Sequence, residues 1–98
     1  MAQYPIVPRP GGNSSVLDIT AATVVKASPG TLFTISFVSG TAGVTVYDST
    51  STSGNTAADE VYALTTSTVG QVVSLTWPCA SGIVVVPGAS TVVAVAYA

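Results

Sequence analysis

Charged residues are scarce in this sequence of 98 residues. Only 6% of the residues are charged, whereas a typical soluble domain has roughly 25%. The cations are Arg9 and Lys26, and the acids are Asp18, Asp48, Asp59 and Glu60. Because phosphate binding requires several Lys or Arg side chains, we expect no nucleic-acid partner.

Histidine is absent, and cysteine occurs once, as Cys79. Without His, the chain lacks the commonest general base and metal ligand, and nothing activates Cys79 or a serine as a nucleophile. We therefore predict no enzyme activity, no catalytic residue, no cofactor and no metal ligand. A single cysteine cannot form an internal disulfide, so Cys79 is expected to be a buried structural thiol in a protein made in the cytoplasm.

Long apolar runs are missing as well. The longest, residues 83–87, is much shorter than the roughly 18 residues that a membrane-spanning helix requires. The amino-terminal residues include Pro5, Pro8 and Pro10 and have no continuous apolar core, which is not typical of a secretion signal. We expect no membrane partner.

Alternating β-strand patterns are what the sequence does contain. In the stretch 29–48, Phe33, Ile35 and Phe37 alternate with polar residues, and the alternation resumes in residues 44–48 after a Gly-bounded connection. We interpret this stretch as an antiparallel β-hairpin whose two aromatic side chains begin the core.

Further strand patterns follow at short intervals. In residues 71–77, Val73, Leu75 and Trp77 share one face, and Pro78 is expected to end the strand because it lacks an N–H donor. Turn residues separate the other candidate strands, which are residues 16–20, 23–27, 60–66, 83–86 and 91–97. Seven or eight short strands predict an all-β antiparallel sandwich, either a jelly roll or an immunoglobulin-like fold.

The chain divides into two parts on composition. Residues 1–15 contain three prolines and a Gly-Gly pair, which favours an extended arm; residues 16–98 form the predicted sandwich domain. We expect Tyr4, Ile6 and Val7 of the arm to dock on the body or on a neighbour, with a disordered tail as the alternative.

Two alternative binding sites are considered and given less weight. Asp48, Asp59 and Glu60 flank the Ser/Thr-rich loop 49–58 and carry oxygen ligands of the kind that Ca²⁺ takes. We prefer the interpretation that Asp48 caps this loop by accepting backbone N–H groups. Exposed aromatic side chains would form a sugar-stacking platform, but Trp77 is expected in the core. The aromatic residues in question are Tyr4, Tyr47, Tyr62 and Trp77.

The near absence of charge has a consequence for the surface. Soluble monomers normally keep themselves dispersed and guard their sheet edges with charged side chains. We infer that neighbouring molecules cover much of this surface, and we place an oligomer contact at Val92, Ala94 and Ala96. The alternative is a neutral monomer whose Ser and Thr hydroxyls keep it in solution.

Three segments carry a resemblance to a known family. The run KASPGTLFTISFVSGTAGVTVYDSTSTSG, the segment SGIVVVPG and the final TVVAVAYA resemble small β-sandwich virion proteins of tailed bacteriophages, of the head decoration (cement) type. The resemblance covers about residues 24–98 and rests on turn and strand patterns. It carries over no catalytic residues.

The resemblance implies a structural role on the virus particle. It implies a homo-oligomer, a trimer or pentamer, that lies on the capsid surface and binds across subunits of the major capsid protein. In that setting, the arm residues expected to contact a partner are Tyr4, Ile6, Val7 and Arg9. The alternative is a receptor- or carbohydrate-binding module of a phage head or tail fibre.

Overall fold

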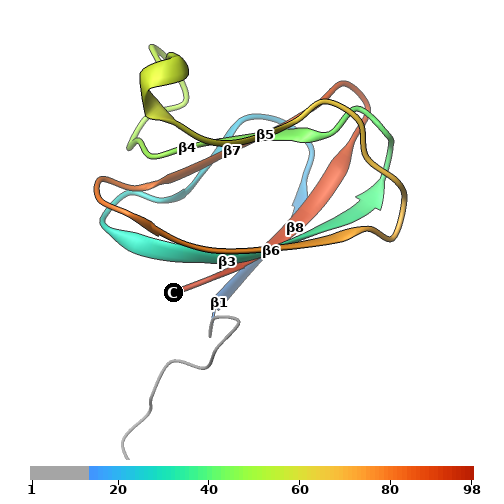
Figure 1. Ribbon diagram of the computed structural model, residues 1–98, viewed down its shortest axis with the longest axis horizontal. Coiled ribbons are helices and arrows are strands. Elements are labelled where there is room, and N and C mark those ends of the chain that lie inside the picture. Colours follow the sequence, from blue (N-terminus) through green and yellow to red (C-terminus); the bar gives the residue numbers. More distant parts are fainter. Residues whose placement is uncertain (1–13) are drawn as a thin grey trace, which may run out of the picture.

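The computed structural model describes residues 14–98 (Figure 1). Eight strands and one short 3₁₀ helix, Ala57–Asp59, account for the regular structure in these residues. The strands are β1 (Ser14–Ile19), β2 (Thr23–Lys26), β3 (Gly30–Ser39), β4 (Val44–Tyr47), β5 (Glu60–Leu64), β6 (Val72–Cys79), β7 (Ile83–Pro87) and β8 (Val92–Tyr97). The predicted all-β fold class is confirmed.

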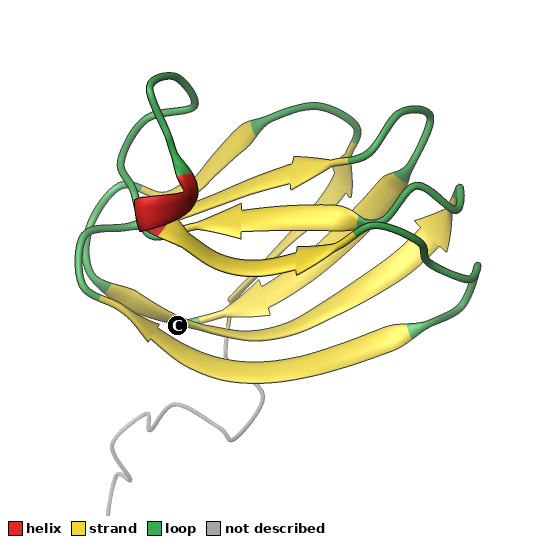
Figure 2. Ribbon diagram, turned by 45° about the horizontal axis from the view of Figure 1, so that its top comes forward, coloured by secondary structure: helices red, strands yellow, loops and turns green. Residues whose placement is uncertain are grey.

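The strands form two four-stranded antiparallel sheets that pack face to face (Figure 2). One sheet has the order β1-β8-β3-β6, and the other has the order β2-β7-β4-β5. The pairs are nested along the chain: β1 with β8, β2 with β7, β3 with β6, and β4 with β5. This is the connectivity of an eight-stranded jelly roll, so the strand order excludes the immunoglobulin-like alternative.

The predicted hairpin in residues 29–48 is wrong. β3 pairs with β6 and β8, whereas β4 pairs with β5 and β7, so the connection between them crosses from one sheet to the other. Gly40 (φ 83°) and Gly43 (φ 75°) permit the sharp turns of this crossing. Alternation shows that one face of each strand is buried, but it does not show which sheet the strand joins.

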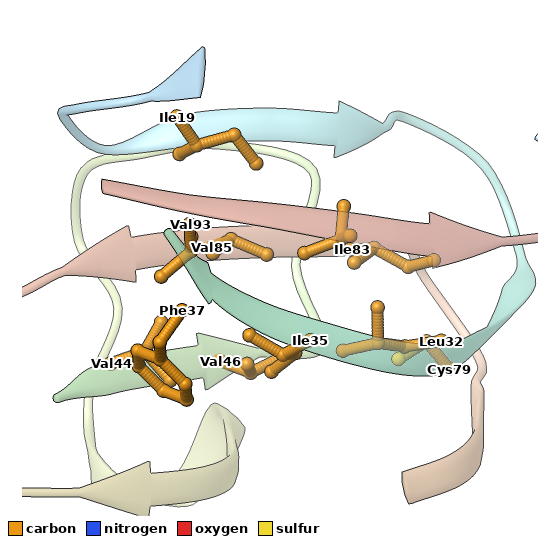
Figure 3. Packing of buried hydrophobic residues seen from close by; sticks show 11 residues of the cluster. Ile19, Leu32, Ile35, Phe37, Val44, Val46, Cys79, Ile83, Val85 and Val93 are labelled. Carbon is orange, nitrogen blue, oxygen red and sulfur yellow. The ribbon is translucent and has the colours of Figure 1, made fainter. Parts of the chain in front are cut away.

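The core lies between the sheets and is almost entirely aliphatic (Figure 3). Ile35 and Phe37 from β3 face Val44 and Val46 from β4 across it, and all four are at most 1% exposed. The remaining buried members are Ile19, Leu32, Cys79, Ile83, Val85, Val93 and Val95. The sandwich is therefore held together mainly by β-branched side chains, which suit a pleated and half-buried surface.

Phe33 does not take the core position that alternation predicts. The neighbouring Leu32 is fully buried instead, and Phe33 is only partly buried and lies outside the core cluster. The register of β3 shifts between Leu32 and Thr34 against both β6 and β8. A bulge at this point reverses the alternation, so the sequence pattern assigned the wrong aromatic side chain to the core.

β6 also departs from the prediction. The strand continues through Pro78 to Cys79, because β6 lies at the edge of its sheet and one side of it needs no ladder partner. Trp77, expected in the core, is 49% exposed at this edge. Thr76 next to it has a φ of 47°, and an extra residue enters β6 here relative to β3.

Both ends of the described chain meet at one end of the first sheet. Ser14 at the start of β1 lies opposite Tyr97 at the end of β8, and Ala98 exchanges two backbone hydrogen bonds of 2.9 Å with Thr31. Ser14 and Ser15 already belong to β1, whereas the first strand was expected to begin at residue 16. The predicted arm contacts Tyr4, Ile6, Val7 and Arg9 lie outside the described residues.

Candidate binding surface

A shallow groove runs over the outer face of the β1-β8-β3-β6 sheet. It has a volume of about 190 Å³ and follows β8, with β1 on one side and β3 on the other. Its lining consists of small or apolar side chains: Ser15, Leu17, Thr34, Ser36, Ala94, Val95 and Ala96. Ala94 and Ala96 alternate with the buried Val93 and Val95, so the two-residue period of β8 places their methyl groups on the outer face.

Two of the three predicted oligomer-contact residues meet in this groove. Ala94 and Ala96 are part of its lining, whereas Val92 pairs with Ser39 and does not line it. Leu17, which the sequence analysis did not select, is 71% exposed at the groove. Leu17 lies between Val16 and Ile19, whose side chains face the core, and this position could have indicated that Leu17 points outward. A bulge in β1 interrupts the regular alternation, so the sequence pattern did not reveal it.

Charge is missing from the groove. Within residues 14–98, none of the charged side chains lines it. Asp18 follows Leu17 directly and is exposed, with a left-handed φ of 56° at the β1 bulge. Farther across the same sheet, Val72 on β6 lies opposite Ser36 and is 60% exposed. The groove is therefore uncharged, and exposed aliphatic side chains lie on the strands at both edges of the sheet.

Among the acids in the described residues, Asp48 accepts the most hydrogen bonds. Its carboxylate accepts backbone hydrogen bonds from Ala80 (2.9 Å), Ser81 (2.8 Å) and Gly82 (3.3 Å), in the turn between β6 and β7. Burial alone would raise the pKa of Asp48, but these three donors outweigh it and leave the pKa below its ordinary value. Acceptance of backbone N–H groups was predicted, although in the loop 49–58 and not in this turn.

The other two acids of the calcium alternative have different surroundings. The Asp59 carboxylate accepts a hydrogen bond of 3.3 Å from the backbone N–H of Thr56, as part of a capping box on the 3₁₀ helix. Glu60 begins β5 and is exposed. In the part of the chain that the structure describes, no group of three or more His, Cys, Asp or Glu side chains converges as a metal site would require. The calcium alternative therefore gains no geometric support here.

Cys79 is buried in the core, as expected for a structural thiol. Burial is the main cause that raises its pKa, to about 11, and the negative charge of Asp48 adds to the effect. A thiol reacts through its thiolate, so this environment suppresses nucleophilic chemistry at Cys79.

Within residues 14–98, the aromatic side chains proposed for a sugar-stacking platform do not gather in one place. Trp77 lies on β6 in the first sheet, while Tyr47 and Tyr62 lie on β4 and β5 in the second. Tyr62 packs against the core, and Tyr4 lies outside the described residues. Trp77 is thus an exposed aromatic side chain at the edge of the first sheet, and any sugar-stacking role would fall to it without Tyr47 or Tyr62.

The loop 49–58 projects from the sandwich together with the 3₁₀ helix that precedes β5 (Figure 1). Its polar side chains bond largely to each other: Asn55 donates to the Ser51 carbonyl at 2.7 Å, and the Ser51 and Ser53 hydroxyls lie 3.3 Å apart. These local contacts give the loop a defined shape without a core of its own.

Comparison with known proteins adds no identification. No family model, no curated protein and no solved structure matches the chain. Among residues 14–98, there is also no helix with the length and apolar character needed to cross a lipid bilayer.

Proposed function

We propose that this protein is a structural component of a tailed-bacteriophage virion, namely a capsid decoration protein. In this proposal it forms a homo-oligomer on the capsid surface, binds across subunits of the major capsid protein and so stabilises the head. It acts through contact area and not through catalysis, without a cofactor, a nucleic acid or a membrane as partner.

The observation that carries the proposal is the uncharged groove on the outer face of the β1-β8-β3-β6 sheet. Leu17 and Val72 leave 71% and 60% of their surface exposed there, on either side of the alanines of β8. Burying apolar surface contributes roughly 25 cal/mol per Å², so a face of this kind gains most when another protein covers it. A face meant for permanent contact with water would carry charged side chains instead.

The jelly-roll connectivity supports the proposal by analogy. Eight-stranded jelly rolls serve as viral capsid domains, but they also serve as lectins, so the fold alone does not separate these two functions. The resemblance of residues 24–98 to phage decoration proteins favours the first.

Binding to a viral shell is the direct test. The purified protein would be mixed with expanded, undecorated capsids of tailed bacteriophages, and bound protein would be measured after sedimentation, together with the mass of the free protein by light scattering. We expect saturable binding, an oligomeric mass, and capsids that resist disruption better when decorated. A protein that remains monomeric and binds no shell contradicts the proposal.

Paired surface variants would locate the contact. Ala94→Arg places a charged side chain in the groove, whereas Ala63→Arg places the same side chain at an exposed position of β5 in the other sheet. We expect Ala94→Arg to lower oligomerisation or capsid occupancy and Ala63→Arg to leave both unchanged. Equal effects of the two variants would show that the groove is not the contact.

The second candidate function is carbohydrate or receptor binding. The observation that favours it is the 49% exposure of Trp77, since exposed indole rings stack on sugar rings. If this alternative holds, the unmodified protein binds glycans on an array, Trp77→Ala abolishes that binding, and the protein need not bind capsids. Absence of any glycan signal from the unmodified protein argues against it.

A further inference from the structure

The groove on the first sheet begins where residues 1–13 join the described chain. Ser15 pairs with Ala96 across β1 and β8, and both residues line the groove. Ser14, one residue earlier, is the first residue of β1. The chain that precedes Ser14 therefore starts at one end of the groove.

The sequence before Ser14 suits a return over this face. In the sequence Arg9-Pro10-Gly11-Gly12, Pro and Gly occupy the two central positions that a type II turn favours, and such a turn would reverse the chain direction. Before this turn comes the apolar segment Tyr4-Pro5-Ile6-Val7-Pro8. Five residues of extended Pro-rich chain span about 15 Å, which exceeds the roughly 7–10 Å covered by Ala94 to Ala96 on β8.

The backbone of β8 and its small side chains, which form the floor of the groove, favour binding of a Pro-rich segment. β8 lies between β1 and β3 and forms backbone ladders with both, so its own backbone offers nothing further to a segment lying on its outer face. A ligand there must leave its backbone groups to water, and a Pro-rich segment has few N–H donors to satisfy. The small side chains of Ala94 and Ala96 leave room for larger side chains from above, with Leu17 at the β1 side.

Charge is also compatible with this placement. Arg9, the cation next to the apolar segment, would meet no positive charge among the residues that line the groove. The exposed Asp18 follows Leu17 in β1 and carries the opposite charge. A short tether of this kind gives an effective concentration in the millimolar range, which favours the chain's own segment over a competing partner in dilute solution.

We propose that the segment Tyr4–Pro8 binds in the groove of its own chain and covers Ala94, Ala96 and Leu17 in the monomer. The proposal does not depend on the proposed capsid function. It gives the uncharged groove an occupant in the monomer, and it makes release of the segment a step that precedes any oligomer or capsid contact through this face.

Disulfide trapping tests the proposal. Val7→Cys and Ser36→Cys would place one thiol on the segment and one on the β3 side of the groove, while the buried Cys79 stays out of exchange. At low protein concentration under mild oxidation, we expect an intramolecular disulfide, detected by mass spectrometry as a monomer that has lost two hydrogens.

A blocking substitution distinguishes binding in the groove from chance collisions of a flexible segment, which would also form the disulfide. Adding Ala94→Arg to the cysteine pair should slow ring closure about tenfold, because it fills the groove, while adding Ala63→Arg should leave the rate unchanged. Ser15→Arg, at the mouth of the groove, provides a second blocking variant should Ala94→Arg fail to fold. Closure that ignores both blocking variants, or covalent dimers in place of closed monomers, overturns the proposal; dimers would assign the groove to a second copy.

Discussion

The Asp48 carboxylate at the end of β4 accepts a hydrogen bond of 2.8 Å from the backbone N–H of Ser81, which lies 33 residues later in the chain. Ala80 and Gly82 donate to the same carboxylate. Because β6 and β7 belong to different sheets, this contact anchors the turn that joins the two sheets to the end of a third strand. One short acidic side chain thus organises a connection far from it in sequence.

The Asp48 contact predicts acid-sensitive stability. The three hydrogen bonds hold the pKa of Asp48 below its ordinary value of 3.8 in the folded protein. The stabilisation is therefore complete above about pH 5 and is lost as the pH falls through the folded-state pKa. Asp48→Asn should lower the free energy of unfolding by about 1 kcal/mol at neutral pH, a value reduced for solvent exposure, and flatten the decline between pH 5 and 2.

Urea denaturation at a series of pH values measures this effect. Glu60→Gln, at an exposed position, is the control, and its free energy of unfolding should stay within about 0.5 kcal/mol of the parent protein. If Asp48→Asn and the parent protein lose stability in parallel as the pH falls, another carboxylate is responsible.

Gly43 is expected to tolerate no side chain. Its φ is 75°, and a Cβ atom there would meet the carbonyl group of Leu64. Gly70 has a similar φ of 86°, but nothing lies within 4 Å of its Cβ position. Gly70→Ala should therefore pay only the left-handed backbone cost of about 1–2 kcal/mol, and Gly43→Ala should lose more than about 3 kcal/mol. Thermal unfolding of both variants gives the comparison, and equal losses would show that the turn around residue 43 adapts.

The two phenylalanines of β3 are expected to differ sharply. Phe37 is fully buried, so Phe37→Ala should destabilise the protein by about 3–5 kcal/mol. Phe33 lies at a bulge outside the core cluster, so Phe33→Ala should remove no more than about 1–2 kcal/mol. Chemical denaturation of both variants decides the matter; a larger loss at Phe33 would mean that the regular alternation holds after all.

Cys79 should be slow to react while the protein is folded. Burial, with a smaller contribution from Asp48, raises its pKa from 9.0 to about 11, which lowers the thiolate fraction at pH 8 about a hundredfold. A disulfide reagent with a coloured product should label the native thiol at least that much more slowly than the urea-unfolded one. Rapid labelling of the native protein would show that the β6 edge opens readily.

The sequence was informative wherever a residue's local neighbours decide its position. The alternation of Val93 and Val95 with Ala94 and Ala96 correctly separates the inner face of β8 from the outer face. It also places Ala94 and Ala96 on the outer face, where both line the groove, while their role as an oligomer contact stays a prediction.

The errors arose where long-range pairing or a bulge decides the outcome. Nothing local distinguishes a hairpin from a crossing between sheets, so β3 and β4 were wrongly paired. A single extra residue in a strand reverses the side-chain alternation, which moved Phe33 out of the core and hid Leu17 in the bulged β1. Trp77 was misplaced because alternation cannot reveal that β6 is an edge strand.

The position of β8 between β1 and β3 has a consequence for how the protein is made. Neither β1 nor β3 can complete its hydrogen-bonding until residues 92–97 have left the ribosome, so the first sheet cannot assemble progressively during synthesis. Topologies dominated by such distant pairings fold in milliseconds to seconds. During that interval β1 and β3 both lack β8 as a neighbour, and unpaired strand edges of this kind are prone to pair with another chain.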